Sequence, residues 1–254
     1  MPVEQNYFLN EQVPIAVPIW REGFIGVDWL ALRYSPVYYG LGVPRGDGSA
    51  VVLVPGFLAN DSYLQEMYWW LRRIGYKPYM SNIGRNANCI SELSEKLIKT
   101  VERAYQDTGR KVHLIGHSLG GVLSRSITTQ RPEMVASIIT LASPFRGLSS
   151  HPLVMRAADS VRARVQNQQP GRAARGCFTG ACSCAAATAL RDGLAHKIPR
   201  TAIYTKTDGI VDWQMCINAD STTNFEVLGT HGGLAFNPMV YRIVVNRLAA
   251  IKNK

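Results

Sequence analysis

The fold is decided by one stretch of sequence, residues 111–121, which reads KVHLIGHSLGG. Its apolar run, 112–115, is typical of a buried strand, and a helix is expected to follow to about Thr129. Between them the chain has the pattern Gly-x-Ser-x-Gly at 116–120. Glycines two residues to either side of Ser118 permit a tight, strained turn that lifts its hydroxyl to the helix N-terminus. This context favours a nucleophilic serine over an incidental turn.

Strands and helices alternate on both sides of this stretch. Apolar runs bounded by turn residues predict further strands at 51–54, 77–81, 136–141, 201–205 and 225–228. Apolar residues at helical spacing predict helices near 20–34, 63–74, 91–107 and 238–251. The alternation indicates a single α/β domain over 1–254, with a mostly parallel central sheet between two layers of helices.

Residues 149–199 break this alternation, because they separate two predicted strands by far more than an ordinary connection. We interpret them as a lid-like insertion that covers a pocket, the alternative being a loop-rich surface excursion. Three cysteines crowd within it, Cys177, Cys182 and Cys184. They are compatible with a disulfide, with free thiols, or with a metal site that takes a fourth ligand from Cys216 or His196. A disulfide with free thiols is favoured over a metal.

Composition excludes some classes of protein. The chain has 254 residues, is 46% hydrophobic and carries a formal charge of +10, so it can bury a core and is not wholly disordered. No apolar run is long enough to span a bilayer and no Sec-type leader is visible, which predicts a soluble, cytoplasmic protein. The chain is basic, but its sequence has no zinc-finger spacing, no RNP motif and no block of lysines. No nucleic-acid partner is therefore expected, whereas transient contact with a lipid surface stays open.

A serine nucleophile needs a base and an acid to orient it. His231 follows the last predicted strand in a glycine-rich loop, Leu228-Gly229-Thr230-His231-Gly232-Gly233, and is the predicted base. Asp208 follows the predicted strand 201–205 and is the predicted acid, because carboxyl ends of parallel strands share one edge. Asp212 lies four residues further on and competes for this role, unless it caps a helix or pairs with an arginine. His117 is expected to point away from the Ser118 hydroxyl.

An acyl-transfer site also needs donors for an oxyanion and a pocket for the acyl group. The loop after the first strand reads Val54-Pro55-Gly56-Phe57-Leu58. We predict that the N–H groups of Phe57 and Leu119 are the two donors, the alternative for Phe57 being a simple Pro-Gly turn. Tyr63 and Phe145 are the predicted aromatic residues of the pocket, together with Phe57 and apolar parts of the insertion.

From about Ser49 to Leu248 the chain resembles the α/β-hydrolase superfamily, in its bacterial lipase and esterase branch. The resemblance rests on the Pro55-Gly56-Phe57 loop, the Gly116–Gly120 elbow, the Asp208–Val211 turn and the Gly229–His231 loop. The segment Ser143-Pro144-Phe145-Arg146-Gly147 is similar to the Ser-Pro-His-x-Gly segment of bacterial lipases. Phe145 replaces its histidine, and Pro55 replaces the histidine of the common His-Gly loop.

The resemblance implies a three-layer α/β-hydrolase fold and a serine carboxylic-ester hydrolase that acts through an acyl-enzyme on Ser118. It implies no cofactor and no metal, and a small-molecule or lipid ester as substrate. Acyl transfer or thioester cleavage by the same three residues is the alternative within enzymes. A non-catalytic binding protein with this fold is the alternative outside them. The oligomeric state and the acyl-chain length are not predicted.

Overall fold

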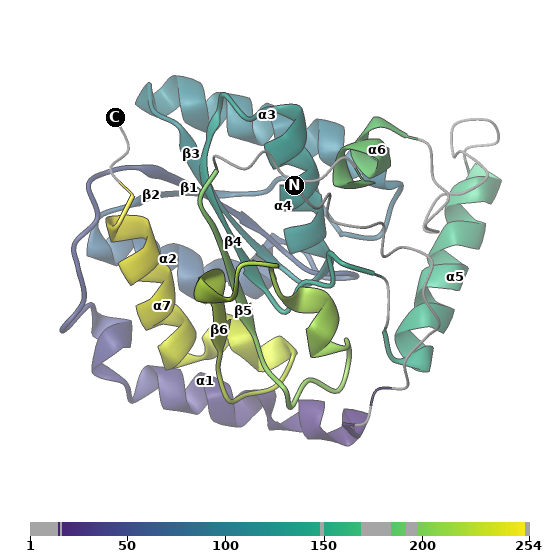
Figure 1. Cartoon of the computed structure of the whole chain (residues 1–254), viewed down its shortest axis with the longest axis horizontal. Helices are drawn as coiled ribbons and strands as arrows, with labels where there is room; N and C mark the ends of the chain where they lie inside the picture. The colour runs from purple at the N-terminus through teal and green to yellow at the C-terminus, as the bar shows by residue number, and fades with distance from the viewer. Residues whose placement is uncertain (1–14, 16, 148–149, 169–183, 192–197, 252–254) are drawn as a thin grey trace.

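A parallel sheet forms the centre of the molecule in the computed structural model, which describes residue 15 and residues 17–147, 150–168, 184–191 and 198–251 (Figure 1). The strands of the described part lie in the order β2-β1-β3-β4-β5-β6, and every pairing between them is parallel. Their bounds are β1 (Ala50–Val54), β2 (Lys77–Met80), β3 (Val112–His117), β4 (Val135–Leu141), β5 (Arg200–Tyr204) and β6 (Asn224–Glu226). The central strands β1, β3 and β4 are buried throughout, as their unbroken apolar runs predict.

Helices cover both faces of this sheet (Figure 1). One face carries α1 (Ile25–Arg33), α2 (Gln65–Ile74) and α7 (Pro238–Ala249), and the other carries α3 (Ile90–Thr108) and α4 (Leu119–Gln130). Beyond them lie α5 (Pro152–Gln168) and α6 (Ala185–Arg191). The 3-10 helices are η1 (Ile19–Phe24), η2 (Pro36–Tyr39), η3 (Asp61–Leu64), η4 (Trp213–Cys216), η5 (Ser221–Thr223) and η6 (Gly232–Phe236). The predicted three-layer α/β architecture is confirmed.

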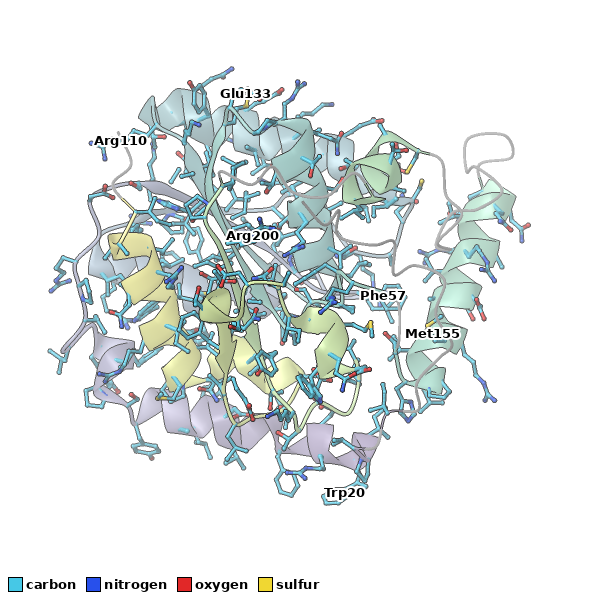
Figure 2. All side chains as sticks on the ribbon, in the orientation of Figure 1. Trp20, Phe57, Arg110, Glu133, Met155 and Arg200 are labelled. Atoms are coloured by element: carbon cyan, nitrogen blue, oxygen red, sulfur yellow. The ribbon has the colours of Figure 1, made fainter. Side chains whose placement is uncertain are left out.

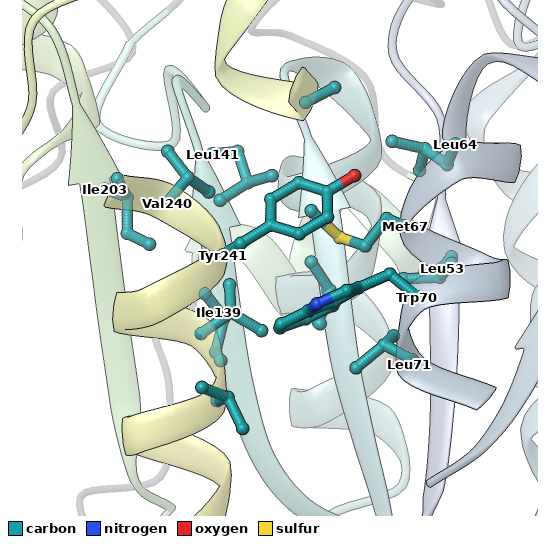
Figure 3. Close-up of a cluster of buried hydrophobic side chains, with 14 of the residues drawn as sticks. Leu53, Leu64, Met67, Trp70, Leu71, Ile139, Leu141, Ile203, Val240 and Tyr241 are labelled. Atoms are coloured by element: carbon teal, nitrogen blue, oxygen red, sulfur yellow. The ribbon is translucent and has the colours of Figure 1, made fainter. Parts of the chain in front are cut away.

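Two apolar cores hold the layers together. On one face the rings of Trp70 and Tyr241 lie 4.6 Å apart between α2 and α7, packed with Leu53 and Met67 (Figure 3). On the other face the apolar stripe of α3 packs against β1 and β3. Each fully buried large side chain contributes about 1.5–3 kcal/mol to stability. The sheet is therefore a firm support for the loops at its edges.

Local differences from the predicted elements are small. The predicted helix over 20–34 is η1 followed by α1, so the chain changes from a 3-10 to an α-helix at Ile25. The strand expected at 225–228 is shorter and lies at Asn224–Glu226. Within 149–199 the described parts contain α5 and α6.

The cysteine cluster of the insertion is only partly described. Cys177 and Cys182 lie outside the described residues, whereas Cys184 packs beside Cys89 and Val161 in a small apolar cluster. In the described ranges no group of His, Cys, Asp and Glu side chains is arranged to hold a metal ion. None of the helices that the structure describes has the length and apolar character needed to cross a membrane.

Parallel strands bring their carboxyl ends to one edge of the sheet, and there the predicted site residues gather. Val54 pairs with Gly116 at the ends of β1 and β3, so the loop after β1 lies beside the turn after β3. Asp208 follows β5 and His231 follows β6. The fold thus places four loops around one point.

Candidate active site

Ser118 occupies a strained turn between β3 and α4. Its backbone angles are φ 51° and ψ −124°, in a region that a residue with a side chain rarely adopts. The Ser118 N–H donates to the carbonyl of Leu141 at 2.8 Å, which secures the turn. A Cβ on Gly120 would overlap the carbonyl oxygens of Val54 and Pro55. The glycine is needed because α4 approaches the end of β1 closely, as the Gly-x-Ser-x-Gly pattern predicts.

His231 and Asp208 form a buried pair. The Nδ1 atom of His231 lies 2.7 Å from Oδ2 of Asp208. The other carboxylate oxygen of Asp208 accepts the backbone N–H groups of Ile210 and Val211, each at 2.8 Å. These bonds fix the carboxylate in the orientation that meets the imidazole. Asp212 instead accepts the N–H of Gln214 and caps η4, which is the alternative considered for it.

The pKa of His231 is raised above its ordinary value. Burial lowers this pKa, but the adjacent Asp208 carboxylate, by charge and hydrogen bond, raises it by more, and Glu22 adds to the rise. With Asp208 on Nδ1, the neutral ring carries its proton there and has a lone pair on Nε2. The ring can therefore accept a proton from a neighbouring hydroxyl. Ser118 and His231 line the same cavity.

His117 contacts both the backbone and the ring of His231. Its Nε2 lies 2.9 Å from the carbonyl oxygen of His231, and the two ring centroids are 4.9 Å apart. Because a carbonyl only accepts, Nε2 of His117 carries the proton. Burial lowers the pKa of His117 to about 3, so the ring stays neutral. The prediction that His117 points away from the reacting hydroxyl did not anticipate this contact with the base.

The loop after β1 lies against Ser118. A Cβ on Gly56 would be 3.1 Å from the Cβ of Ser118, so the backbone next to Phe57 approaches the serine closely. Buried Asn86 braces this loop, since its side chain donates to the Pro55 carbonyl at 2.8 Å. Leu119 begins α4, and its N–H has no acceptor within the helix. Phe57 and Leu119 both line the cavity that contains Ser118.

This cavity has a volume of about 480 Å³, within the usual range of roughly 300–1,000 Å³ for small-molecule sites. Apolar side chains from α3, α4, α5 and α6 dominate its lining, among them Leu93, Val122, Leu153, Met155 and Leu190. Phe57 lies between the edge of the sheet and α5, and Met155 is on α5 itself (Figure 2). The described helices of the insertion thus contribute to the wall of the cavity that contains Ser118.

The two aromatic residues predicted for the pocket behave differently. Tyr63 lines the cavity, and its hydroxyl donates to the carbonyl of Gly232 at 2.5 Å. Burial raises the pKa of Tyr63, which keeps that hydroxyl protonated. Phe145 does not line this cavity, and its assignment to the pocket is corrected. Its ring lies under the Arg125 guanidinium and packs against Val122 and Ala202, because the turn after β4 directs it beneath α4.

Sequence reasoning missed Glu22, Asn86 and the role of His117. Glu22 accepts backbone N–H groups of Gly209 and His231, each at 3.0 Å. No local pattern marks these contacts, since Glu22 and His231 are 209 positions apart. For Asn86, the sole signal is a polar residue in a stretch that connects a strand to a helix.

Comparison with known proteins gives related sequences and folds. Residues 77–173 match the PGAP1-like alpha/beta domain family. A triacylglycerol lipase of Burkholderia plantarii is 30% identical over 131 residues, which cover 48% of this chain and 37% of that protein. A triacylglycerol lipase of Pseudarthrobacter phenanthrenivorans is 33% identical over 106 residues, which cover 38% of this chain and 33% of that protein. The chain spans about a third of the length of these curated relatives.

Solved structures share the fold at low sequence identity. The monoacylglycerol lipase of Paleococcus ferrophilus superposes with a TM-score of 0.56 at 15% identity, over 82% of this chain and 96% of that one. Aspergillus fumigatus lipase B gives a TM-score of 0.54 at 17% identity, over 82% of this chain and 55% of that one. The matched segment 77–173 contains the Ser118 turn. The chain therefore shares its fold with these solved lipases, and part of its sequence is similar to that of triacylglycerol lipases.

Proposed function

We propose that this protein is a serine carboxylic-ester hydrolase, an esterase or lipase. The observation that carries the proposal is the buried Asp208–His231 pair, with 2.7 Å between carboxylate and imidazole, on the same cavity as a strained serine. A serine, a base and an acid that orients the base are the parts that acyl transfer to a serine needs. The related sequences, named triacylglycerol lipases, support the same activity.

In the proposed acylation step, Oγ of Ser118 attacks the ester carbonyl carbon while Nε2 of His231 takes its proton. The carbonyl electrons move to oxygen, and the N–H groups of Phe57 and Leu119 stabilise that oxyanion. The dipole of α4 adds positive potential at its N-terminus, where Ser118 lies. Collapse of the tetrahedral intermediate breaks the bond to the alcohol, which leaves with the proton from His231.

Deacylation repeats the sequence with water. His231 takes a proton from a water molecule, whose oxygen attacks the acyl carbon, and the proton then returns to Ser118 as the acid leaves. Asp208 stabilises the imidazolium that forms twice in the cycle. No cofactor takes part in this proposal.

We propose an ester with a hydrophobic acyl group as substrate. The apolar lining from α4, α5 and α6 supports an acyl chain in this cavity, because each buried methylene gains about 0.8 kcal/mol.

In this proposal the chain is one α/β domain, and the insertion 149–199 forms a movable wall of the acyl site. Met155 lies on that wall, so Met155→Trp should slow hydrolysis of a palmitate ester more than that of an acetate ester.

The experiment is hydrolysis of p-nitrophenyl esters from acetate to palmitate by the wild type and by Ser118→Ala. We expect activity in the wild type, a chain-length optimum above acetate, and loss of activity in the variant. The optimum separates esterase from lipase. No hydrolysis of any ester by the wild type, with no labelling of Ser118 by a fluorophosphonate, would overturn the proposal. Faster transfer to an added alcohol than to water would assign acyl transfer instead.

A further inference from the structure

Glu22 is a carboxylate held among backbone donors beside the candidate site. It lies on η1, and its oxygens accept the N–H groups of Gly209 at 3.0 Å, His231 at 3.0 Å and Gly232 at 3.2 Å. In the described part of the chain these three N–H groups are its hydrogen-bond partners, and no lysine or arginine pairs with it. Three backbone donors hold this carboxylate in one position, whereas the carboxylate of a surface glutamate is solvated.

The three donors belong to two loops that must keep a fixed distance. Gly209 directly follows Asp208, whereas His231 and Gly232 belong to the loop after β6. One oxygen of Glu22 accepts from both loops at once, from Gly209 and from His231. Glu22 therefore bridges the backbone of the acid to the backbone of the base, in addition to the direct contact between their side chains.

The elements around Glu22 pack closely on these loops. A Cβ on Gly209 would lie 3.2 Å from the Cα of Ile19, and one on Gly232 would lie 2.9 Å from Cδ1 of Ile25. One turn along α1, Asp28 accepts the Thr230 hydroxyl at 3.1 Å. The segment η1–α1 is thus seated directly on the acid and base loops.

The chemistry of a carboxylate suits this position better than that of an amide. A carboxylate has only acceptor oxygens, so both can face N–H groups. A glutamine would turn one NH₂ group toward a donor and leave a partly buried N–H without an acceptor. The negative charge also faces the imidazole of His231. Among the described residues, the Asp208 carboxylate and the neutral ring of His117 also lie against that imidazole.

We propose that Glu22 is a positioning residue of this site, which locks the Asp208 loop to the His231 loop and so holds the imidazole in line with Ser118. The kinetic consequence of this proposal rests on the proposed hydrolase function. The effect of Glu22 on the imidazole of His231 does not depend on that function. A misplacement of a reacting group by about 1 Å costs on the order of 100-fold in rate. Loss of the carboxylate should therefore lower kcat and leave KM nearly unchanged.

The test compares Glu22→Gln with Glu22→Asp and the matched control Glu133→Gln. Glu133 is exposed and lies at the opposite end of the molecule from Trp20 of η1 (Figure 2). We expect kcat on p-nitrophenyl butyrate to fall about 10- to 100-fold in Glu22→Gln. Glu22→Asp retains the charge on a shorter side chain and should recover part of kcat. The control should match the wild type.

The second readout is the pKa of His231, followed by NMR titration of its imidazole carbon-bound proton in each variant. We expect this pKa to fall in Glu22→Gln, because a facing negative charge is lost, and to stay higher in Glu22→Asp. A merely structural role would lower the melting temperature without this shift. Unchanged kcat and unchanged His231 pKa in Glu22→Gln would overturn the proposal, as would a loss of kcat that follows only a loss of thermal stability.

The two readouts keep this proposal separate from the hydrolase function. If the wild type hydrolyses no ester and Ser118 takes no fluorophosphonate, the hydrolase proposal fails. The titration of His231 still decides whether Glu22 controls the imidazole. Should Glu22→Gln not fold, Glu22→Asp carries the comparison, and a wild-type kcat in that variant contradicts a need for the full reach of the glutamate.

Discussion

The serine side and the base side of the candidate site are built in different ways. Ser118 takes its strained backbone from the five consecutive residues Gly116–Gly120, and this turn is seated on the ends of β1 and β4. His231 depends on contacts from distant segments, with its N–H on Glu22, its carbonyl on His117 and its ring on Asp208. We therefore expect the turn at Ser118 to be less sensitive to substitutions in distant segments, and the position of His231 to depend on each of its three contacts.

The largest expected effect is on the serine side. Ser118→Ala removes the nucleophile, and kcat on p-nitrophenyl butyrate should fall by at least about 10³-fold. Steady-state hydrolysis measures it, and circular dichroism checks that the fold is retained. Ser160→Ala, on the exposed side of α5, is the matched control and should keep wild-type activity. Equal activity in the two variants would contradict the role of Ser118.

The next effect separates the two acids on the base side. Asp208→Asn should lower kcat/KM on the order of 10³-fold, because the imidazolium loses its buried carboxylate. Asp212→Asn removes the charge but keeps an oxygen that can cap η4, so it should stay within about threefold of the wild type. Steady-state kinetics on one ester provides the comparison. A greater loss in Asp212→Asn would reverse the assignment of the acid.

The pH dependence of catalysis also tests the pairing of Asp208 with His231. Catalysis needs neutral His231, so kcat/KM should decline as the pH falls through the raised pKa of that residue. Asp208 raises this pKa, so Asp208→Asn should move the acid limb to lower pH. A limb that stays in place in Asp208→Asn would show that another group titrates there.

The buried His117 should make the folded protein less stable at acid pH. The folded pKa of His117 is about 3, against 6.5 for the ordinary group. Between these values the unfolded chain binds a proton that the folded chain excludes, so stability falls as the pH drops below 6.5. His117 should contribute about 2 kcal/mol of loss between pH 7 and 4.5. Urea unfolding at both pH values should show a smaller fall in His117→Gln, and an equal fall would contradict this account.

The smallest effect concerns the hydrogen bond from His117 to the His231 carbonyl. His117→Phe keeps a ring but loses the donor, and kcat should fall roughly tenfold as the base loop loosens, about 1.4 kcal/mol in barrier height. His117→Gln can supply an amide donor and should retain more activity. Kinetics on a short-chain ester measures both. Full activity in His117→Phe would show that the base loop needs no support from below.

The division between the two sides also explains what could be predicted. The turn at Ser118 and the alternation of strands and helices follow from neighbouring residues, so the sequence alone predicts the fold. Asp208 and His231 were predicted from their places after two strands, because parallel strands bring those places to one edge. The structure places these two side chains together as expected.

Features that depend on distant contacts could not be predicted. Glu22 meets Gly209 and His231 across 187 and 209 positions, and its partners are backbone N–H groups that carry no side-chain pattern. The direction of Phe145 depends on how the turn after β4 packs beneath α4. A sequence shows that a ring is present, but the packing of the neighbouring layer decides which cavity it faces.

Fluorophosphonate labelling, followed by intact-mass measurement and peptide mapping, shows directly whether Ser118 is a nucleophile activated by His231. We expect a single adduct on Ser118 in the wild type, none in Ser118→Ala, and much slower labelling in His231→Ala because the base that activates the hydroxyl is gone. Ester hydrolysis with the adduct on another residue, or labelling of Ser118 at the wild-type rate in His231→Ala, would contradict it.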